Sequence, residues 1–218
     1  MQGKVKPSCV ICAWRESCNK KYSIVDPSRC QDFTRDLGIK EIPGGNAVKL
    51  LVEGAPGSGK STLIERLLTK LSDVRAGGFY TREMRKDGAR AGFKIVTVDK
   101  MEGVLAHVDS AGRVMAGKYS INLEAIDTVA VPAIERAVMH DDLIVIDEIG
   151  KMELHSKRFC EMVNIALDSD KPLVATVPSA GPPFVEDIKK RHDVRVVHLD
   201  IKNRDEVLEQ AARLLREG

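Results

Sequence analysis

The spacing of apolar residues along the chain predicts alternating strands and helices. Apolar runs indicate strands at 47–53, 143–146, 173–177 and 194–199. Apolar residues three and four positions apart indicate helices at 62–71, 123–139, 156–167, 183–191 and 204–215. Because strands alternate with helices, the pattern favours an α/β fold built on a largely parallel, doubly wound sheet. Pro132 lies inside the helix at 123–139, where we expect a kink or a break.

Between residues 78 and 115 the pattern changes to the alternation of apolar and polar residues that is typical of antiparallel strands. Strands at 79–81 and 92–98 flank Lys86-Asp87-Gly88, which is a hairpin turn signal. Short runs at 105–108 and 113–115 predict a second hairpin around Ser110-Ala111-Gly112. We expect these hairpins to extend the parallel sheet at one edge.

The segment between the first strand and the first helix carries a phosphate-binding motif. It fits G-x-x-x-x-G-K-[ST] and comprises Gly54, Ala55, Pro56, Gly57, Ser58, Gly59, Lys60 and Ser61, with Thr62 next in the predicted helix. Glycines let consecutive backbone N–H groups turn toward bound phosphates, and the start of the helix adds its positive end. We expect Lys60 to reach the β- and γ-phosphates and the Ser61 hydroxyl to ligate Mg²⁺.

A second motif follows the apolar run at 143–146, which is typical of a strand buried on both faces of a parallel sheet. The run ends in Asp147 and Glu148, and two acids there are costly unless they project into a polar site at the carboxyl edge of the sheet. In nucleotide-hydrolysing proteins with this loop, the first acid holds Mg²⁺ and the second can take a proton from water. We therefore predict Asp147 as an Mg²⁺ residue and Glu148 as the catalytic base, with Ile149 and Gly150 beside the nucleotide.

Composition narrows the class of protein. The 218 residues are 43% hydrophobic and 30% charged, as in an ordinary globular protein, and the net charge of +2 says little about partners. No run approaches the roughly 20 apolar residues of a membrane span, and residues 1–7 lack the apolar stretch of a signal peptide, so we expect a cytosolic protein without a membrane partner. An aromatic content of 4% gives little support for stacking on single-stranded nucleic acid.

Four of the five cysteines fall in the first thirty residues, namely Cys9, Cys12, Cys18 and Cys30. A segment this short cannot bury a core of its own, and a reducing cytosol disfavours disulfides. We therefore predict a metal-stapled module at residues 1–42, held by Zn²⁺ or by a [4Fe–4S] cluster, ahead of a nucleotide-binding domain at 47–218. The fifth cysteine, Cys160, falls in an amphipathic helix and is expected to be a buried small hydrophobe.

With both nucleotide motifs placed, the chain resembles the THEP1 nucleoside-triphosphatase family over residues 47–218. The matching blocks are GAPGSGKSTL at 54–63, GGFYTREMRKDGARAGFKIVTV at 77–98, GKYSINLEA at 117–125, LIVIDEIGKMELHSKRF at 143–159 and NRDEV at 203–207. The resemblance implies a RecA-like P-loop core. It also implies Mg²⁺-dependent hydrolysis of ATP, GTP and other nucleoside triphosphates with little base preference. The cysteine module is an addition to the family's core form.

Three basic residues between and after the motifs have two interpretations each. Arg82 and Arg85 lie in the block between the motifs, where one of them would serve as an arginine finger. The alternative, slightly favoured, is a solvated hairpin face within a run of charges. Lys151, three residues past Glu148, is placed to reach a γ-phosphate or to lie in solvent at a helix entry.

Four further residues are weaker candidates. Thr176 ends a predicted strand, where it would orient the attacking water or, as we favour, simply pack as a β-branched residue. Asn203 and Arg204 precede the last helix, where a base or ribose would lie, although Asn203 is explained nearly as well as a helix cap. His155 follows the DEIGKMEL block and is expected at the surface unless it contributes to the site.

Two other functions remain open from the sequence. A kinase would transfer the phosphate to a nucleoside, a nucleotide or an RNA end, with the basic segment 82–94 holding the acceptor. A nucleotide-dependent switch would use the cysteine module as a sensor or as a dock for a protein partner that the sequence does not identify. The guanine-selecting N-K-x-D tetrapeptide is absent, which weakens a GTP switch.

Overall fold

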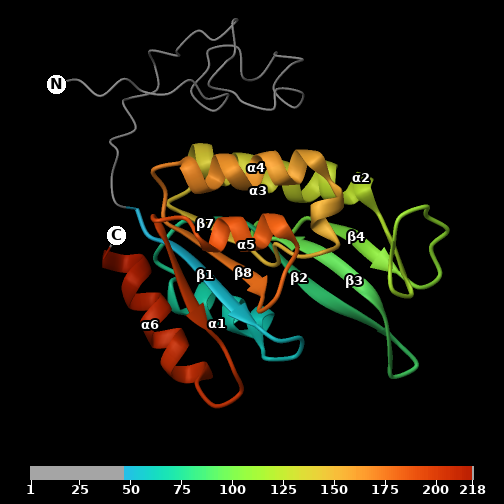
Figure 1. Ribbon diagram of the computed structural model, residues 1–218, viewed down its shortest axis with the longest axis horizontal. Coiled ribbons are helices and arrows are strands. Elements are labelled where there is room, and N and C mark those ends of the chain that lie inside the picture. Colours follow the sequence, from blue (N-terminus) through green and yellow to red (C-terminus); the bar gives the residue numbers. More distant parts are fainter. Residues whose placement is uncertain (1–46, 218) are drawn as a thin grey trace, which may run out of the picture.

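The computed structural model describes residues 47–217, and the predicted cysteine module lies outside them. Within the described residues the strands form a single sheet in the order β5-β6-β4-β3-β2-β7-β8-β1-β9 (Figure 1). The parallel strands are β1 (Lys49–Gly54), β2 (Ala76–Lys86), β7 (Leu143–Ile146), β8 (Leu173–Pro178) and β9 (Val194–His198). This confirms the predicted α/β fold and its parallel core.

Helices cover both faces of the parallel strands (Figure 1). The core on one face is built from α3 (Val131–His140), α4 (Lys157–Asp168) and α5 (Pro183–Lys189). The core on the other face is built from α1 (Lys60–Lys70) and α6 (Arg204–Glu217). Because both faces are buried, the strands need apolar side chains pointing both ways, which explains the continuous apolar runs in the sequence.

The helix predicted at 123–139 is interrupted, as the proline suggested. It consists of α2 (Leu123–Ala125), a π-helical turn η3 (Ile126–Ala130) and α3, which has Pro132 in its first turn. Proline has no N–H to continue an α-helical ladder, and the wider turn accommodates this at the point where Pro132 enters. Asn122 begins the element, since its side chain accepts the Ala125 N–H at 3.1 Å.

The antiparallel extension confirms one predicted hairpin and corrects the other. β2 pairs with β3 (Ala89–Thr97) around a turn in which Asp87 and Gly88 have positive φ, as a tight hairpin requires. The second prediction was wrong, because β4 (Glu102–His107) pairs with β6 (Tyr119–Ile121) and not with residues 113–115. The short β5 (Met115–Ala116) also pairs with β6, and Gly117 at φ 60° makes the turn between them. The turn signal was therefore at Gly117 and not at Gly112.

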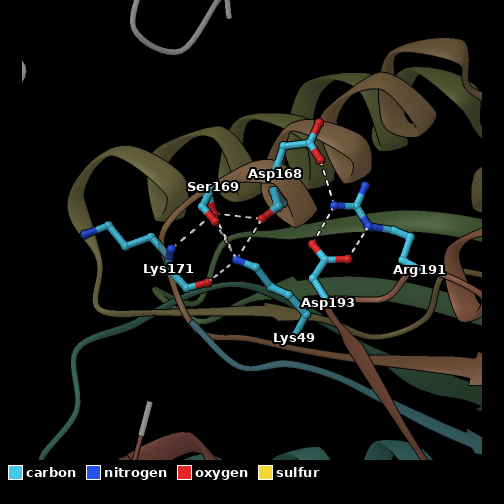
Figure 2. Close-up of polar contacts among 7 residues, drawn as sticks. Lys49, Asp168, Ser169, Lys171, Arg191 and Asp193 are labelled. Carbon is cyan, nitrogen blue, oxygen red and sulfur yellow. Dashed lines mark hydrogen bonds and ion pairs between the residues drawn. The ribbon is translucent and has the colours of Figure 1, made fainter. Parts of the chain in front are cut away.

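A polar cluster fastens the parallel sheet at the end where its strands begin (Figure 2). Lys49 is 3% exposed, and its ammonium donates to the carbonyl oxygens of Ser169 at 2.9 Å and of Lys171. Arg191 bridges Asp168 and Asp193 at 2.8 and 2.7 Å. Burial lowers the pKa of Lys49 to about 8. Since the P-loop follows the other end of β1, this cluster is structural and remote from it.

Within residues 47–217 no helix combines the length and the apolarity that crossing a membrane requires.

Candidate functional site

The P-loop runs from Gly54, the last residue of β1, to Lys60, the first residue of α1. The loop closes on itself, because the Ser58 N–H donates to the Ala55 carbonyl at 3.1 Å. Gly57 and Gly59 have φ values of 80° and 102°, in the left-handed region that side chains with a Cβ rarely adopt. The glycines of the motif therefore hold a backbone conformation that the loop needs.

Lys60 joins the two nucleotide motifs. Its ammonium donates to the Gly54 carbonyl at 3.0 Å and lies 3.3 Å from Oε2 of Glu148. Burial raises the pKa of Glu148 above its ordinary value, and the nearby Lys60 charge opposes that shift. The geometry thus places the predicted catalytic base within contact distance of the predicted phosphate-binding lysine.

Asp147 is completely buried at the end of β7. Its Oδ1 accepts a hydrogen bond from the Thr176 hydroxyl, and its Oδ2 accepts from the N–H and hydroxyl of Thr81 at 3.2 and 3.3 Å. Among the described residues no lysine or arginine forms an ion pair with it, and its side-chain partners are the hydroxyl and N–H donors of the two threonines. An oxygen-preferring cation such as Mg²⁺ fits this environment, and Ser61 follows Lys60 in the first turn of α1 to offer a second oxygen.

Two threonines contact Asp147, one that the sequence did not single out and one that it named as a weaker candidate. Thr81 was assigned only to a strand, and its contact with Asp147 depends on β2 lying beside β7. Thr176, for which packing was favoured, does pack in β8 and also orients the Asp147 carboxylate. Neither contact has a local sequence signal, because both come from neighbouring strands of the sheet.

Glu153, like Thr81, was not singled out by the sequence. It is 4% exposed, and its Oε2 accepts the Gly150 N–H at 3.2 Å. Burial, followed by the nearby Glu148 carboxyl, raises the pKa of Glu153 to about 8. A Cβ on Gly150 would lie 2.7 Å from Glu148 Oε1 and 3.1 Å from Glu153 Oε2, so this glycine separates the two carboxyls.

The weaker basic candidates lie at the surface. Arg82 donates to Glu65 of α1 at 2.8 Å, with both side chains exposed, and its guanidinium lies over the Tyr80 ring. Arg85 bonds to Glu83 at 2.9 Å within the hairpin. Lys151 is exposed in the turn after Gly150.

His155 is exposed at the end of the short 3₁₀ turn Glu153–His155. Cys160 is half-buried, which corrects the prediction of a buried residue; its thiol lies 3.7 Å from the Leu154 carbonyl at the edge of α4. Burial still raises the pKa of that thiol, so it is a poor nucleophile.

Asn203 and Arg204 lie beside the P-loop. Arg204 donates from Nε to the Ser58 carbonyl at 2.6 Å and from Nη2 to the Gly57 carbonyl at 3.3 Å. The Asn203 amide is engaged within its own loop, where it donates to the His198 carbonyl at 2.9 Å and accepts the Asp200 N–H at 2.8 Å. Arg204 therefore binds two carbonyls of the P-loop, whereas Asn203 is bonded within the loop that precedes α6.

Comparison with known proteins agrees with this geometry. A family model described as NTPase matches residues 49–212. The protein named Nucleoside-triphosphatase THEP1 from Thermotoga sp. (strain RQ2) is 48% identical over 169 residues, which cover 78% of this chain and 96% of the relative. Its namesake from Methanocaldococcus jannaschii is 38% identical over 174 residues, covering 78% of this chain and 99% of the relative. The family match begins after the cysteine-containing segment.

Solved structures show the same fold. The crystal structure of THEP1 from Aquifex aeolicus superimposes with a TM-score of 0.72 at 34% identity, over 77% of this chain and 99% of that one. The solution structure of a human cancer-related nucleoside triphosphatase gives a TM-score of 0.68 at 33% identity, over 79% and 99% of the two chains. Since the sequence match, the P-loop α/β fold and the arrangement of the two motifs all agree, the chain belongs to the THEP1 nucleoside-triphosphatase family.

Proposed function

We propose that this protein hydrolyses nucleoside triphosphates, ATP and GTP among them, to the diphosphate and inorganic phosphate in a reaction that requires Mg²⁺. The observation that carries the proposal is the convergence of Lys60, Asp147 and Glu148 at the P-loop, from two motifs far apart in the sequence. The relatives named nucleoside-triphosphatase support it, since the match covers 96% and 99% of their length. The RecA-like arrangement that the resemblance implies is supported by the position of β8 between β1 and β7.

In this proposal the P-loop residues 54–62 hold the phosphates. Backbone N–H groups of the loop and the Lys60 ammonium bind the β- and γ-phosphate oxygens. The Ser61 hydroxyl and the Asp147 carboxylate would hold Mg²⁺, which when bound supplies charge neutralisation at the phosphate oxygens. Ile149 is buried in the hydrophobic core and its N–H donates to the Thr176 carbonyl at 2.9 Å, so we place only the Gly150 turn beside the nucleotide. Thr81 and Thr176 keep the Asp147 carboxylate oriented.

Glu148 acts as the general base. Its carboxylate takes a proton from the attacking water while the water oxygen bonds to the γ-phosphorus and the bond to the bridging oxygen breaks, so that the diphosphate leaves with the electron pair. A raised pKa supports this role, because a carboxylate with an ordinary pKa is a weak base at neutral pH.

The alternatives left open by the sequence gain no support. Neither a kinase acting on nucleosides or RNA ends nor a switch without turnover is indicated by the names of the relatives. Arg82 remains a proposed transition-state residue only if it leaves Glu65, and Lys151 only if it turns inward from its exposed position. Alanine at either position would lower turnover without changing nucleotide affinity if the residue acts on the transition state.

We further propose that residues 1–42 form a separate module in which Cys9, Cys12, Cys18 and Cys30 bind Zn²⁺ or a [4Fe–4S] cluster. The four cysteines precede the family match, and thiolates are good ligands for both. Elemental analysis and the visible spectrum of anaerobically purified protein distinguish the two metals. Full retention of metal after Cys9→Ser and Cys12→Ser would refute the ligand assignment.

The decisive test of hydrolysis is a single-turnover assay with γ-labelled ATP and Mg²⁺. The wild-type chain should release free phosphate, and Glu148→Gln should bind ATP but hydrolyse it at least roughly 10²-fold more slowly, the usual scale for loss of a general base. Glu206→Gln, an exposed position on α6, is the matched control and should behave as wild type. Normal hydrolysis by Glu148→Gln would show that another group is the base, and label on an added nucleoside or RNA would indicate a kinase.

A further inference from the structure

A short loop at residues 179–182 leaves the sheet between the two nucleotide motifs. It follows β8, which lies between β1, the strand that leads into the P-loop, and β7, the strand that the two acids follow (Figure 1). The last residue of β8, Pro178, lies opposite Gly54, the first residue of the P-loop. Lys60 and Glu148 come from opposite sides of this strand and lie 3.3 Å apart. The loop therefore begins beside the site of the proposed hydrolysis.

A nearly buried lysine holds the start of this loop. Lys189 is the last residue of α5, and its side chain is 9% exposed. Its ammonium donates to the carbonyls of Pro178 and Ser179, each at 2.9 Å. A third partner is Oε2 of Glu53, also at 2.9 Å, in the residue just before the P-loop. One cation thus ties the loop after β8 to the strand that carries the P-loop.

The loop keeps its free donors on the side away from α5. Within the described residues, the Ser179 hydroxyl and the N–H groups of Ser179 and Ala180 form no hydrogen bond with the protein, and both residues are exposed. Across a trans peptide bond, the C=O and the following N–H point in opposite directions. Since Lys189 attracts the carbonyls of residues 178 and 179 toward α5, the N–H groups of residues 179 and 180 point away from α5. The P-loop helix α1 packs on that other face of the sheet.

We propose that Lys189 is a positioning residue for hydrolysis, and that it directs the N–H groups of residues 179 and 180 toward the γ-phosphate of a bound nucleoside triphosphate. This role rests on the proposed function, because it requires a triphosphate at the P-loop. Two successive N–H groups that point to one side form an anion-binding concavity. Donors held in place before the reaction stabilise the charge that spreads over the γ-phosphoryl oxygens in the transition state. Loss of the ammonium frees these donors and leaves the phosphate-binding groups of the P-loop in place.

The hydrolysis rate per competent binding site distinguishes positioning from a purely structural role. Calorimetry of the full chain with Mg²⁺ and the β,γ-methylene analogue of ATP gives the dissociation constant and the number of competent sites, and single turnover of ATP gives the rate. Lys189→Met should lower the rate per competent site by roughly tenfold to a hundredfold, the scale of a misplacement of about 1 Å, and should change the dissociation constant by less than about threefold. Lys189→Arg should recover most of the rate, because a guanidinium can donate to both carbonyls. Lys190→Met, at the next and exposed position, is the matched control and should behave as wild type.

A second variant keeps the test available if Lys189→Met does not fold. Glu53→Gln leaves Lys189 in place and removes only the charge of its carboxylate partner, so it should give a smaller loss of rate per competent site. In the double variant the loss should be less than the sum of the two single losses, because both substitutions act on one interaction. A rate per competent site equal to that of Lys190→Met in the folded Lys189→Met chain overturns the proposal. If Lys189→Met does not fold, a wild-type rate in Glu53→Gln does the same.

Amide hydrogen exchange separates this role from hydrolysis itself. In the wild-type chain with Mg²⁺, the β,γ-methylene analogue of ATP should slow exchange at Ser179 and Ala180 more than ADP does, because only the analogue has a γ-phosphate. Lys189→Met should lose this difference, and Lys190→Met should keep it. The expected protection in a chain that releases no phosphate from ATP supports the position of the loop and contradicts hydrolysis. Equal exchange with both ligands in a chain that hydrolyses ATP overturns the role of Lys189 and leaves the proposed function standing.

Discussion

Glu148 and Glu153 show how one residue's environment sets its chemistry. Both lie near Gly150, but Glu148 has the Lys60 ammonium within 3.3 Å, whereas Glu153 meets only a backbone N–H. A buried carboxyl without a cation beside it is more stable when it is protonated. Glu153 is therefore expected to be neutral in the folded protein at neutral pH and to anchor the turn after β7 as a hydrogen-bonding group.

This contrast gives a prediction about pH and stability. The pKa of Glu153 is about 8 when folded and near 4.5 when unfolded, so the folded state binds the extra proton between these values. The contribution of Glu153 to the free energy of unfolding is complete below pH 4.5 and is lost as the pH rises through 8. Glu153→Gln stays neutral at every pH. Its free energy of unfolding should therefore rise relative to that of the wild type by on the order of 1 kcal/mol for each pH unit across this window.

Urea unfolding of the metal-free protein between pH 5 and 8 measures this difference. Glu206→Gln is again the matched control, since its carboxyl is exposed. If the wild-type and Glu153→Gln unfolding free energies run parallel at every pH, Glu153 titrates at its ordinary pKa and the assignment is wrong.

Among single residues, the sequence predicts those that belong to a contiguous motif. Lys60 and the P-loop glycines follow one another along a single turn, and that spacing fixes their arrangement. Thr81 and Glu153 carry no such pattern. Thr81 reaches Asp147 through strand pairing, and Glu153 is distinguished only by its burial, which nothing in its neighbours along the chain reveals.

Among the elements, α6 contributes to the site through its first residue. Arg204 donates to two P-loop carbonyls, and its guanidinium would lie 2.8 Å from a Cβ at Gly59. With the carbonyls held outward, the N–H groups of the loop are left to face the phosphates. The C-terminal helix is thus a support for the phosphate cradle as well as part of the core.

Removing this support should weaken binding of every phosphate ligand. Arg204→Ala is expected to raise the dissociation constants of the ATP analogue and of tripolyphosphate by a similar factor, on the order of tenfold, the scale of hydrogen bonds from a charged donor. Arg204→Lys should recover only part of the affinity, because one ammonium cannot reproduce the planar fork. Calorimetry measures both, and a loss confined to the nucleotide would instead assign Arg204 to the nucleoside.

Element prediction succeeded where the periodicity was long and failed where it was short. Helices α1, α4 and α6 were located because each buries one apolar stripe over several turns. β5 and β6 have two and three residues, too few to show a period, so the strand that pairs with β4 was predicted at 113–115 and not at β6. Short strands are defined by their partners more than by their own composition.

In the whole molecule, the two ends of the parallel sheet have different roles. Lys49 and its neighbours fasten the end where the parallel strands begin, while the P-loop and the acids of β7 meet at the opposite end. The two helical cores on either face connect these ends into one body. A ligand at the P-loop should therefore stabilise the entire described domain and not only a local loop.

Thermal unfolding tests this expectation. At about 100 times its dissociation constant, the Mg²⁺-bound β,γ-methylene analogue of ATP should add about 2.7 kcal/mol of stability and raise Tm by roughly 5–10 °C. Lys60→Ala should abolish the shift, because the lysine binds the phosphates directly. A shift that survives in Lys60→Ala would place the ligand elsewhere.

The hydrogen bonds from Arg204 to the P-loop also have a consequence for how the chain is made. Arg204 follows Ser58 by 146 residues and comes after every strand of the described sheet. A ribosome therefore releases the P-loop long before the side chain that holds its carbonyls exists. Nascent or truncated chains that stop before α6 would carry both nucleotide motifs and still lack a braced cradle, so tight retention of a nucleotide becomes a property of chains whose synthesis has passed Arg204.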